Sequence, residues 1–426
     1  VPTNSMLGGL AYQDPEHASI KNLDLKNLSQ INSEIADTAV DVFVYDTRKD
    51  SDGGAWRKRT QNTSWYNETL GTATRGTRKE FPAVAVIVAE TTQLTIYDGD
   101  DPDLSMWMVF NLLGAVGGNS NMIPRGGSGS ESDITSIACL NGRLAVGLKD
   151  VSGTVGEGLA VIDFISELAR IHRGSGSGYT AAIYRSSILG RNSNSLYYGD
   201  YDTLAIVAET CNDVAMTVLP NAPIDSATGL PIPTIAVATD GGVSVIKDDG
   251  IVVDITSSKA VNDVELVHFD KSGRLYIAAQ SSSSVTDVYQ FIRYTIPSAD
   301  ISNNVYADNS DATYYSSTTS GASFQDVRPN FNAQYNNGVN EDITHISSND
   351  DGGILGNVNG LSIFAENYSS QGNGLVAYTA SEYNTGWMHG DIKGAFLSDT
   401  STTNKTNGQT DPDRSVENNT LTVTGT

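Results

Sequence analysis

A short motif recurs along this chain and limits the folds open to it. Each copy is an Asp followed by Ile or Val, with another apolar residue three or four places later. The copies begin at Asp133, Asp213, Asp263, Asp342 and Asp391. A turn and a second run rich in β-forming residues follow each of the first four. Units that repeat in this way bury their faces against their neighbours, so the sequence predicts an all-β fold, a β-propeller.

The two ends of the repeat series look complementary. The copy in 391–397 has no strand run after it, whereas the strand series that begins at 83–88 has no Asp-led strand before it. A propeller ring closes when one blade takes strands from both ends of the chain. We therefore expect residues 391–397 to pair with the series at 83–110.

The intervals between copies are unequal, which predicts insertions. Two compact units alternate with two enlarged ones, and the extra residues fall at 174–210 and 298–341. This favours five blades, or six or seven if an insertion or a hairpin expected at 40–60 forms another. The propeller is expected over 39–400. Residues 1–38 are expected to be an N-terminal arm, and 401–426 a polar tail or the start of a further domain.

Composition narrows the function classes. The chain has 26 Lys and Arg against 50 Asp and Glu, a formal charge of −24, which argues against a duplex nucleic-acid binder. It has two cysteines, Cys139 and Cys211, which we expect to be buried free thiols rather than a disulfide framework. It contains no run of 18 apolar residues, so we expect no membrane span.

Motifs that carry chemistry are weak in this sequence. It contains no nucleotide-binding loop and no HExxH, and its five His show no ligand spacing. One loop holds Asp98, Asp100, Asp101 and Asp103, which could share a Ca²⁺ ion. It lacks the Gly and Glu of an EF-hand, which favours a solvated turn. We interpret the repeated Asp as a turn cap that accepts hydrogen bonds from backbone N–H groups, rather than as a ring of carboxylates.

An aromatic and basic segment stands out in this acidic chain. Residues 60–79 include Trp65, Tyr66, Arg75, Arg78 and Lys79. The segment is expected to be a loop that covers one face of the propeller, or a docking surface for an acidic partner. We also expect residues 1–38 or 60–79 to contact other chains in a repeated assembly.

Several segments resemble the tail-associated proteins of marine tailed bacteriophages. They are 41–47, 53–61, 63–68, 78–84, 98–102 with 106–108, and 386–399. The resemblance implies a virion tail or fibre component that associates with other tail proteins and with copies of itself. It would be located in the virion and be extracellular after release. In similar chains a lectin-like β-sandwich often follows the last of these segments. The resemblance brings no catalytic motif.

Two main function classes follow, and they assign the contact with a glycan to different residues. One is a structural and attachment protein, for which the insertion at 298–341 supplies Tyr306, Tyr314, Tyr315 and Tyr335 among polar residues. Sugar rings stack on aromatic faces, so these residues could bind a host-surface glycan, or they could pack against a neighbouring subunit. The alternative is a propeller enzyme that cleaves glycans with paired carboxylates. A cellular scaffold propeller is a third class.

Overall fold

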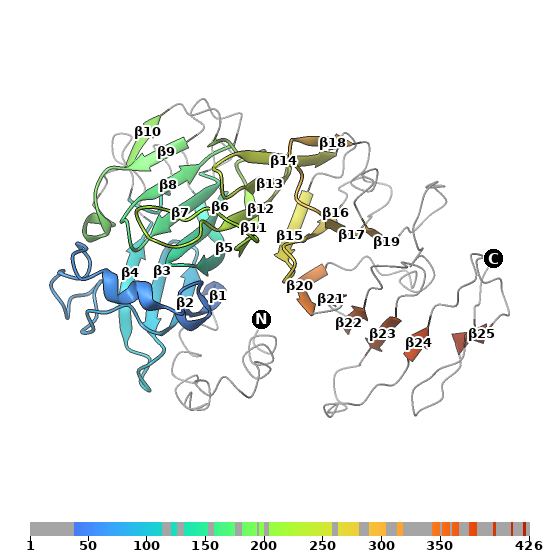
Figure 1. Ribbon diagram of the computed structural model, residues 1–426, viewed down its shortest axis with the longest axis horizontal. Coiled ribbons are helices and arrows are strands. Elements are labelled where there is room, and N and C mark those ends of the chain that lie inside the picture. The colour runs from blue at the N-terminus through green and yellow to red at the C-terminus, as the bar shows by residue number, and fades with distance from the viewer. Residues whose placement is uncertain are drawn as a thin grey trace. The chain divides into compact units, whose positions relative to one another are not determined.

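The computed structural model describes residues 38–112, 121–125, 132–151, 157–174, 181–193, 196–199, 204–257, 263–280, 289–303, 313–317, 343–349, 352–357, 360–365, 375–380, 395–397, 410–411 and 421–422. These ranges hold β-strands and three short 3-10 helices, which confirms the all-β expectation (Figure 1). Among them is no helix long and apolar enough to cross a membrane. The chain forms two compact units, Val1–Asp240 with Ser244–Val252, and Gly241–Val243 with Val253–Thr426.

Most strands lie in five sheets of four to six strands. The first sheet runs β1 (Ala39–Asp46), β2 (Val84–Glu90), β3 (Gln93–Asp98), β4 (Met106–Asn111), with the 3-10 helices η2 (Thr47–Lys49) and η3 (Ala55–Arg59) between β1 and β2. The second runs β10 (Leu196–Gly199), β9 (Ala181–Tyr184), β8 (Ala169–His172), β7 (Leu159–Asp163), β6 (Arg143–Asp150), β5 (Ser132–Leu140), with η4 (Ile188–Gly190) between β9 and β10. The third runs β11 (Cys211–Thr217), β12 (Thr234–Thr239), β13 (Gly242–Ile246), β14 (Val252–Ser257), β18 (Ile301–Asn303).

The remaining strands follow the same order along the chain. The fourth sheet runs β15 (Asp263–Phe269), β16 (Leu275–Gln280), β17 (Tyr289–Tyr294), β19 (Thr313–Ser317). The fifth runs β20 (Ile343–Asn349), β21 (Gly352–Asn357), β22 (Gly360–Ala365), β23 (Leu375–Ala380), β24 (Ala395–Leu397), and β25 (Thr410–Asp411) pairs with β26 (Leu421–Thr422). Where the register of neighbouring strands is described, they pair antiparallel, except that β18 runs parallel to β14.

Local chemistry explains the tight hairpin between β5 and β6. Asn141 and Gly142 have φ of 52° and 72°, the left-handed conformation that a two-residue hairpin turn needs at both central positions. Asn and Gly tolerate this conformation better than other residues do. The turn therefore sets the register of the two strands, in which Leu140 lies opposite Arg143.

The expected closure of the ring is wrong in its strand pairing. Strand β24 adds to the fifth sheet beside β23, with Leu375 opposite Leu397. The strand that leads the first sheet is β1, with Val44 opposite Val86. The long connection between β1 and β2 hides this pairing in the sequence. The expectation of a hairpin at 40–60 is also wrong, because the second half of that segment forms η3 instead of a strand.

The leading strand of each sheet carries a β-bulge or similar irregularity at the same place. The register shifts fall between Ala39 and Asp41, Ile134 and Ser136, Cys211 and Asp213, Val264 and Leu266, and Ile343 and His345. A bulge leaves one residue unpaired and bends its strand. Asp133 and Asp263 precede the bulge, whereas Asp213 follows it, so the Asp motif does not mark one structural position. Two copies, at Asp342 and Asp391, lie outside the described residues.

Hydrogen bonds join the bulges of three leading strands. The Asp41 carboxylate accepts a hydrogen bond of 2.8 Å from the backbone N–H of Ile137, and the Ser136 hydroxyl donates one of 2.8 Å to Asp213. Strand β5 therefore lies between β1 and β11. Asp41 and Asp213 also accept from the backbone N–H of the residue that follows each. Asp213 therefore accepts a backbone N–H, as expected, but it does so from within strand β11 and does not cap a turn.

The second sheet buries both of its faces. Leu144 and Val146 of β6 join a core cluster with residues of the first sheet, whereas Ala145 joins another cluster with β11 and β12. The contact with β11 is close, since a Cβ on Gly147 would lie 2.6 Å from the Sγ of Cys211. Cys139 and Cys211 are buried free thiols, as expected, and burial raises the pKa of both.

We expect Asp41→Ala to lower the free energy of unfolding by about 1–3 kcal/mol, because the partly buried N–H of Ile137 loses its acceptor. Urea unfolding at pH 7 measures the change. Asp103→Ala is the matched control, since Asp103 is exposed, and it should change stability by no more than about 0.5 kcal/mol. Equal effects of the two substitutions would contradict a role for Asp41 in joining β1 to β5.

Candidate functional site

The aromatic residues of segment 60–79 are packed into the first unit. The indole of Trp65 is buried and donates a hydrogen bond of 2.8 Å to the carbonyl of Phe164. Its ring lies 5.4 Å from that of Trp107 in an edge-on arrangement. Further rings extend the cluster, namely Trp56, Phe81, Phe110 and Phe164. Segment 60–79 therefore packs across the first and second sheets, and its role as the cover of a propeller face stays a prediction.

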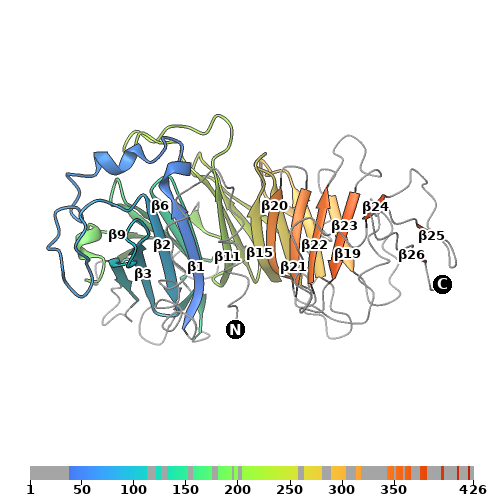
Figure 2. The same cartoon turned by 90° about the horizontal axis from the view of Figure 1, so that it is seen from below.

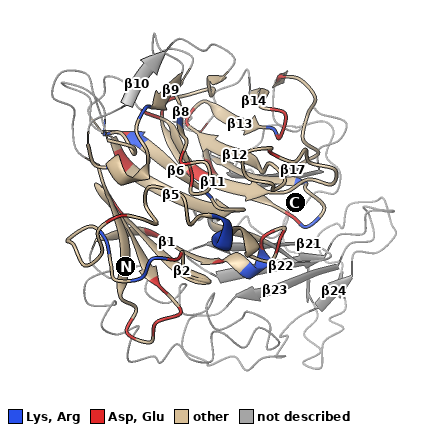
Figure 3. Ribbon diagram, turned by 60° about the vertical axis from the view of Figure 1, so that its left-hand side comes forward, with Lys and Arg blue, Asp and Glu red and all other residues tan. Residues whose placement is uncertain are grey.

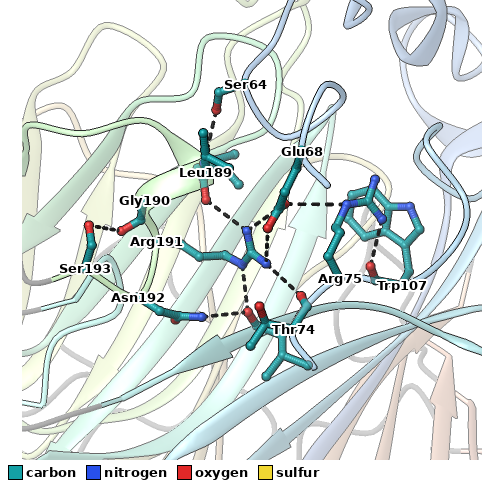
Figure 4. Close-up of polar contacts among 12 residues, drawn as sticks. Ser64, Glu68, Thr74, Arg75, Trp107, Leu189, Gly190, Arg191, Asn192 and Ser193 are labelled. Carbon is teal, nitrogen blue, oxygen red and sulfur yellow. Dashed lines mark hydrogen bonds and ion pairs between the residues drawn. The ribbon is translucent and has the colours of Figure 1, made fainter. Parts of the chain in front are cut away.

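Two buried guanidinium groups share one carboxylate that belongs to this segment (Figure 4). Arg191 is 1% exposed and donates to both oxygens of Glu68, at 3.0 and 3.1 Å. The side chain of Arg75 is 0% exposed, and its Nε lies 3.6 Å from the same carboxylate. Its guanidinium lies 4.5 Å from the centre of the Trp107 ring and donates to the carbonyl of that residue. Burial lowers the pKa of Arg75 to about 10, so the group is still protonated at pH 7.

A network of hydrogen bonds around Asp50 connects the loop after β1 to the second sheet. The buried carboxylate of Asp50 accepts hydrogen bonds from the Tyr45 hydroxyl at 2.5 Å, the Trp56 indole at 2.7 Å and the Asn141 backbone at 2.8 Å. The pKa of Asp50 is raised by burial. The Asn141 side chain donates onward to the carbonyl of Pro231. Figure 2 shows η3 and the loop that precedes β12 on the same side of this unit.

The acidic loop, interpreted from the sequence as a solvated turn or a calcium site, binds a cation of the protein itself. Arg78 donates from Nη1 to Asp98 at 2.7 Å and to Asp100 at 2.8 Å. Asp100 also accepts from two backbone N–H groups, and Asp101 accepts from the N–H of Asp103. Within the described ranges, no group of three or more His, Cys, Asp or Glu is placed to hold a metal ion. Calcium at this loop stays a prediction.

The structure describes two of the four tyrosines that were expected to bind a glycan. Tyr306 and Tyr335 lie outside the described residues. Tyr314 and Tyr315 belong to strand β19, opposite Ile292 and Phe291 of β17. This part of the insertion at 298–341 is therefore sheet and not a polar loop. A role of the four tyrosines in binding stays a prediction.

The insertion at 174–210 also contributes strands. It supplies β9 and β10, which extend the second sheet beyond β8. Residues 204–210 form no strand. They make a single parallel bridge, between Ile206 and Gly174.

A pocket of about 390 Å³ lies in the first unit, and nothing in the sequence had indicated it. Strands β7 and β8 line one side, and β12 with the turn after β13 lines another. The connection between β11 and β12 completes the wall. Aliphatic side chains make up much of the lining, including Val161, Leu168, Ile232, Ile235 and Ile246. Figure 3 shows basic and acidic positions next to each other at the turn between β13 and β14.

Two carboxylates in this pocket are bound to one guanidinium. Arg143 donates from Nε to Asp163 at 3.0 Å and from Nη2 to Asp225. The second oxygen of Asp163 accepts from the backbone N–H groups of Ile165 and Ser166, and that of Asp225 accepts from a backbone N–H. Each carboxylate has both oxygens hydrogen-bonded within the protein. Neither is placed to donate a proton to a glycosidic oxygen, as an acid catalyst must.

His172 lies buried at the pocket wall. Its Nδ1 is 2.9 Å from the carbonyl of Leu204. Burial, with a smaller effect of Arg170, lowers the pKa of His172 to about 4, so the ring is neutral at pH 7. The sequence carried no signal for this pocket. Its lining residues come from β6 to β8 and from the connections before β12 and after β13, which are distant in the chain.

Comparisons with known proteins assign no family. No family model and no curated protein matches the chain. A solved structure to which it is similar is PorZ, described as an essential bacterial surface component of the type-IX secretion system of Porphyromonas gingivalis. The identity is 13% and the TM-score 0.21, and the match covers 68% of this chain and 46% of that one. The chain spans less than half the length of that structure, and a likeness at this TM-score identifies neither fold nor function.

We expect Glu68→Gln to destabilise the protein by about 3–5 kcal/mol, because it leaves two buried guanidinium groups without their carboxylate. Chemical unfolding at pH 7 measures the change. Asp46→Asn is the control, since it removes the more exposed pair with Arg48 while Asn still caps η2. That control should cost no more than about 1 kcal/mol. A similarly small loss for Glu68→Gln would mean that the buried network contributes little.

The buried His172 should make the stability of the protein depend on pH. The ordinary pKa of His is about 6.5, so between pH 6.5 and about 4 the unfolded chain binds a proton at His172 that the folded chain does not. Stability that is fully present above pH 6.5 is therefore lost as the pH falls. Between pH 7 and 4 the wild type should lose about 3 kcal/mol more than His172→Asn, which keeps an N–H for the Leu204 carbonyl. Unfolding free energies that fall equally in the two proteins would contradict this.

Proposed function

We propose that this chain is a β-propeller component of a bacteriophage virion tail or fibre, with a structural and attachment role and no catalytic centre of its own. The five sheets would be its blades. The proposal for the fold is supported by the leading strands, since β5 contacts both β1 and β11, and β15 contacts β20 in the second unit. Inner strands lie side by side in this way when blades surround an axis.

The observation that carries the proposed function concerns the segments that resemble phage tail proteins. Those between residues 41 and 108 fold into one packed cluster. Phe81 lies 5.2 Å from Trp56 and 4.8 Å from Trp107, measured between ring centres. Arg78 joins one segment to Asp98 of another. Because the resembling segments pack on one another, we infer that they form one structural element in common with phage tail proteins. A structural role in the virion would need such an element.

The alternative of a glycan-cleaving enzyme has less support. A propeller glycosidase needs two carboxylates in a cleft that are available to the substrate. In the described pocket, Asp163 and Asp225 both bind Arg143, and Asp249 lies 3.5 Å from Lys247. These pairs engage the carboxylates within the protein instead of leaving them available to a substrate.

Immunogold electron microscopy of intact phage particles tests the proposed function. Antibodies raised against the purified chain should label the tail or its fibres, and prior incubation with the chain should remove the label. Labelling of the capsid alone, or of host cells and no particle, would overturn the proposal. Release of reducing ends from host polysaccharide by the purified chain would instead support the enzyme.

A further inference from the structure

Two charged side chains in the pocket of the first unit are left without a partner. Arg143 binds Asp163 and Asp225, and Lys247 pairs with Asp249. The remaining charges are Arg170, which is exposed, and Asp248, which is half-buried. Neither has an ion pair or hydrogen bond with any residue in the described part of the chain. The pocket thus offers one free cation and one free carboxylate.

Exposed apolar side chains belong to the lining of the same pocket or adjoin it in sequence. Of six exposed large hydrophobic side chains among the described residues, one lines the pocket and two are next in sequence to lining residues. Leu168 lines the pocket and is 51% exposed. Ile224 and Ile251 are 61% and 53% exposed, and each is next in sequence to a lining residue, Asp225 or Gly250. Apolar groups gathered on a surface with a polar rim are typical of protein interaction sites.

We propose that this pocket binds a peptide segment of another protein, which inserts an aliphatic side chain between an acidic and a basic residue. The aliphatic walls take the inserted side chain, Arg170 binds the acidic residue and Asp248 binds the basic one. The proposal rests on the proposed structural role, in which this chain assembles with other tail proteins. A glycan fits less well, because sugar rings stack on aromatic faces and the described lining contains no Phe, Tyr or Trp.

The size of the pocket matches this occupant. Binding pockets are mostly apolar and hold a few placed polar groups, with volumes from about 300 Å³ upward. A volume of about 390 Å³ lies near the lower end of that range. One anchoring side chain with its flanking backbone suits such a space better than a long segment would. The flanking charges line the pocket and contribute to the choice of partner more than to affinity.

Titration of the purified chain with the tripeptide acetyl-Asp-Leu-Lys-amide tests the proposal. Methyl NMR should show shifts confined to residues of the pocket, such as Val161, Leu168 and Ile232. The matched peptides acetyl-Asp-Gly-Lys-amide, which lacks the anchor, and acetyl-Asn-Leu-Gln-amide, which lacks the charges, should bind more weakly.

Substitutions in the chain separate the anchor from the charges. Arg170→Gln and Asp248→Asn should each weaken binding of the charged tripeptide about two- to five-fold, as expected for exposed ion pairs. Binding of the uncharged tripeptide should not change. Lys58→Gln and Asp103→Asn are the matched controls at exposed positions outside the pocket. Ala227→Trp fills the pocket from an exposed position and should reduce binding at least ten-fold, with an unchanged thermal midpoint.

Three outcomes would overturn the proposal. One is equal binding of the leucine and glycine tripeptides, and another is full binding by Ala227→Trp. The third is a shift of the same methyl signals by D-glucuronate but not by the tripeptides, which would make the pocket a saccharide site. This titration needs no virion, so its failure is distinct from the absence of immunogold label on particles.

Discussion

The burial of both faces of the second sheet is the constraint on which the first unit depends. Successive residues of β6 enter different cores, since Leu144 and Val146 face the first sheet and Ala145 faces the third. A strand with two buried faces needs a sheet on each side, because a face left in water would forfeit the stabilisation from apolar burial. The side toward β11 holds small residues, and at Gly147 a methyl group would overlap the Cys211 sulfur. The spacing of the sheets is therefore set by side-chain size.

Strand positions could be read from the sequence more reliably than strand partners. Apolar runs and the Asn141-Gly142 turn indicate β5 and β6 directly, since both signals are local. The bulge could not be read, because the residue that follows it is Asp41 in one sheet, Ser136 in the next and Leu266 in the fourth. A repeated backbone irregularity that accepts such different side chains leaves no repeated motif. The pairing of β1 with β2 was missed because a long connection separates them.

Charge pairing explains why the candidate sites could not be predicted. From the sequence, Arg75 and Arg78 look like free cations on a docking surface, yet Arg75 is buried against Glu68 and Arg78 binds Asp98. The partner of Glu68 in the bidentate pair is Arg191, 123 residues away in the chain. No local pattern connects residues at that distance, and composition counts paired and unpaired charges alike. The charges that matter for binding are those left over after the internal pairs are formed.

The twist of the sheets accounts for where those unpaired charges lie. Adjacent strands in a sheet are rotated by about 20–25° from one another, so two sheets in close contact at their leading strands separate toward their later strands. The second and third sheets approach closely at Gly147, whereas the pocket opens beside β7 and β8. At the close end, side chains of one sheet reach those of the next, as Ser136 reaches Asp213. At the open end Arg170 and Asp248 have no such neighbour among the residues that the structure describes, so we expect another molecule to bind in the space between these two sheets.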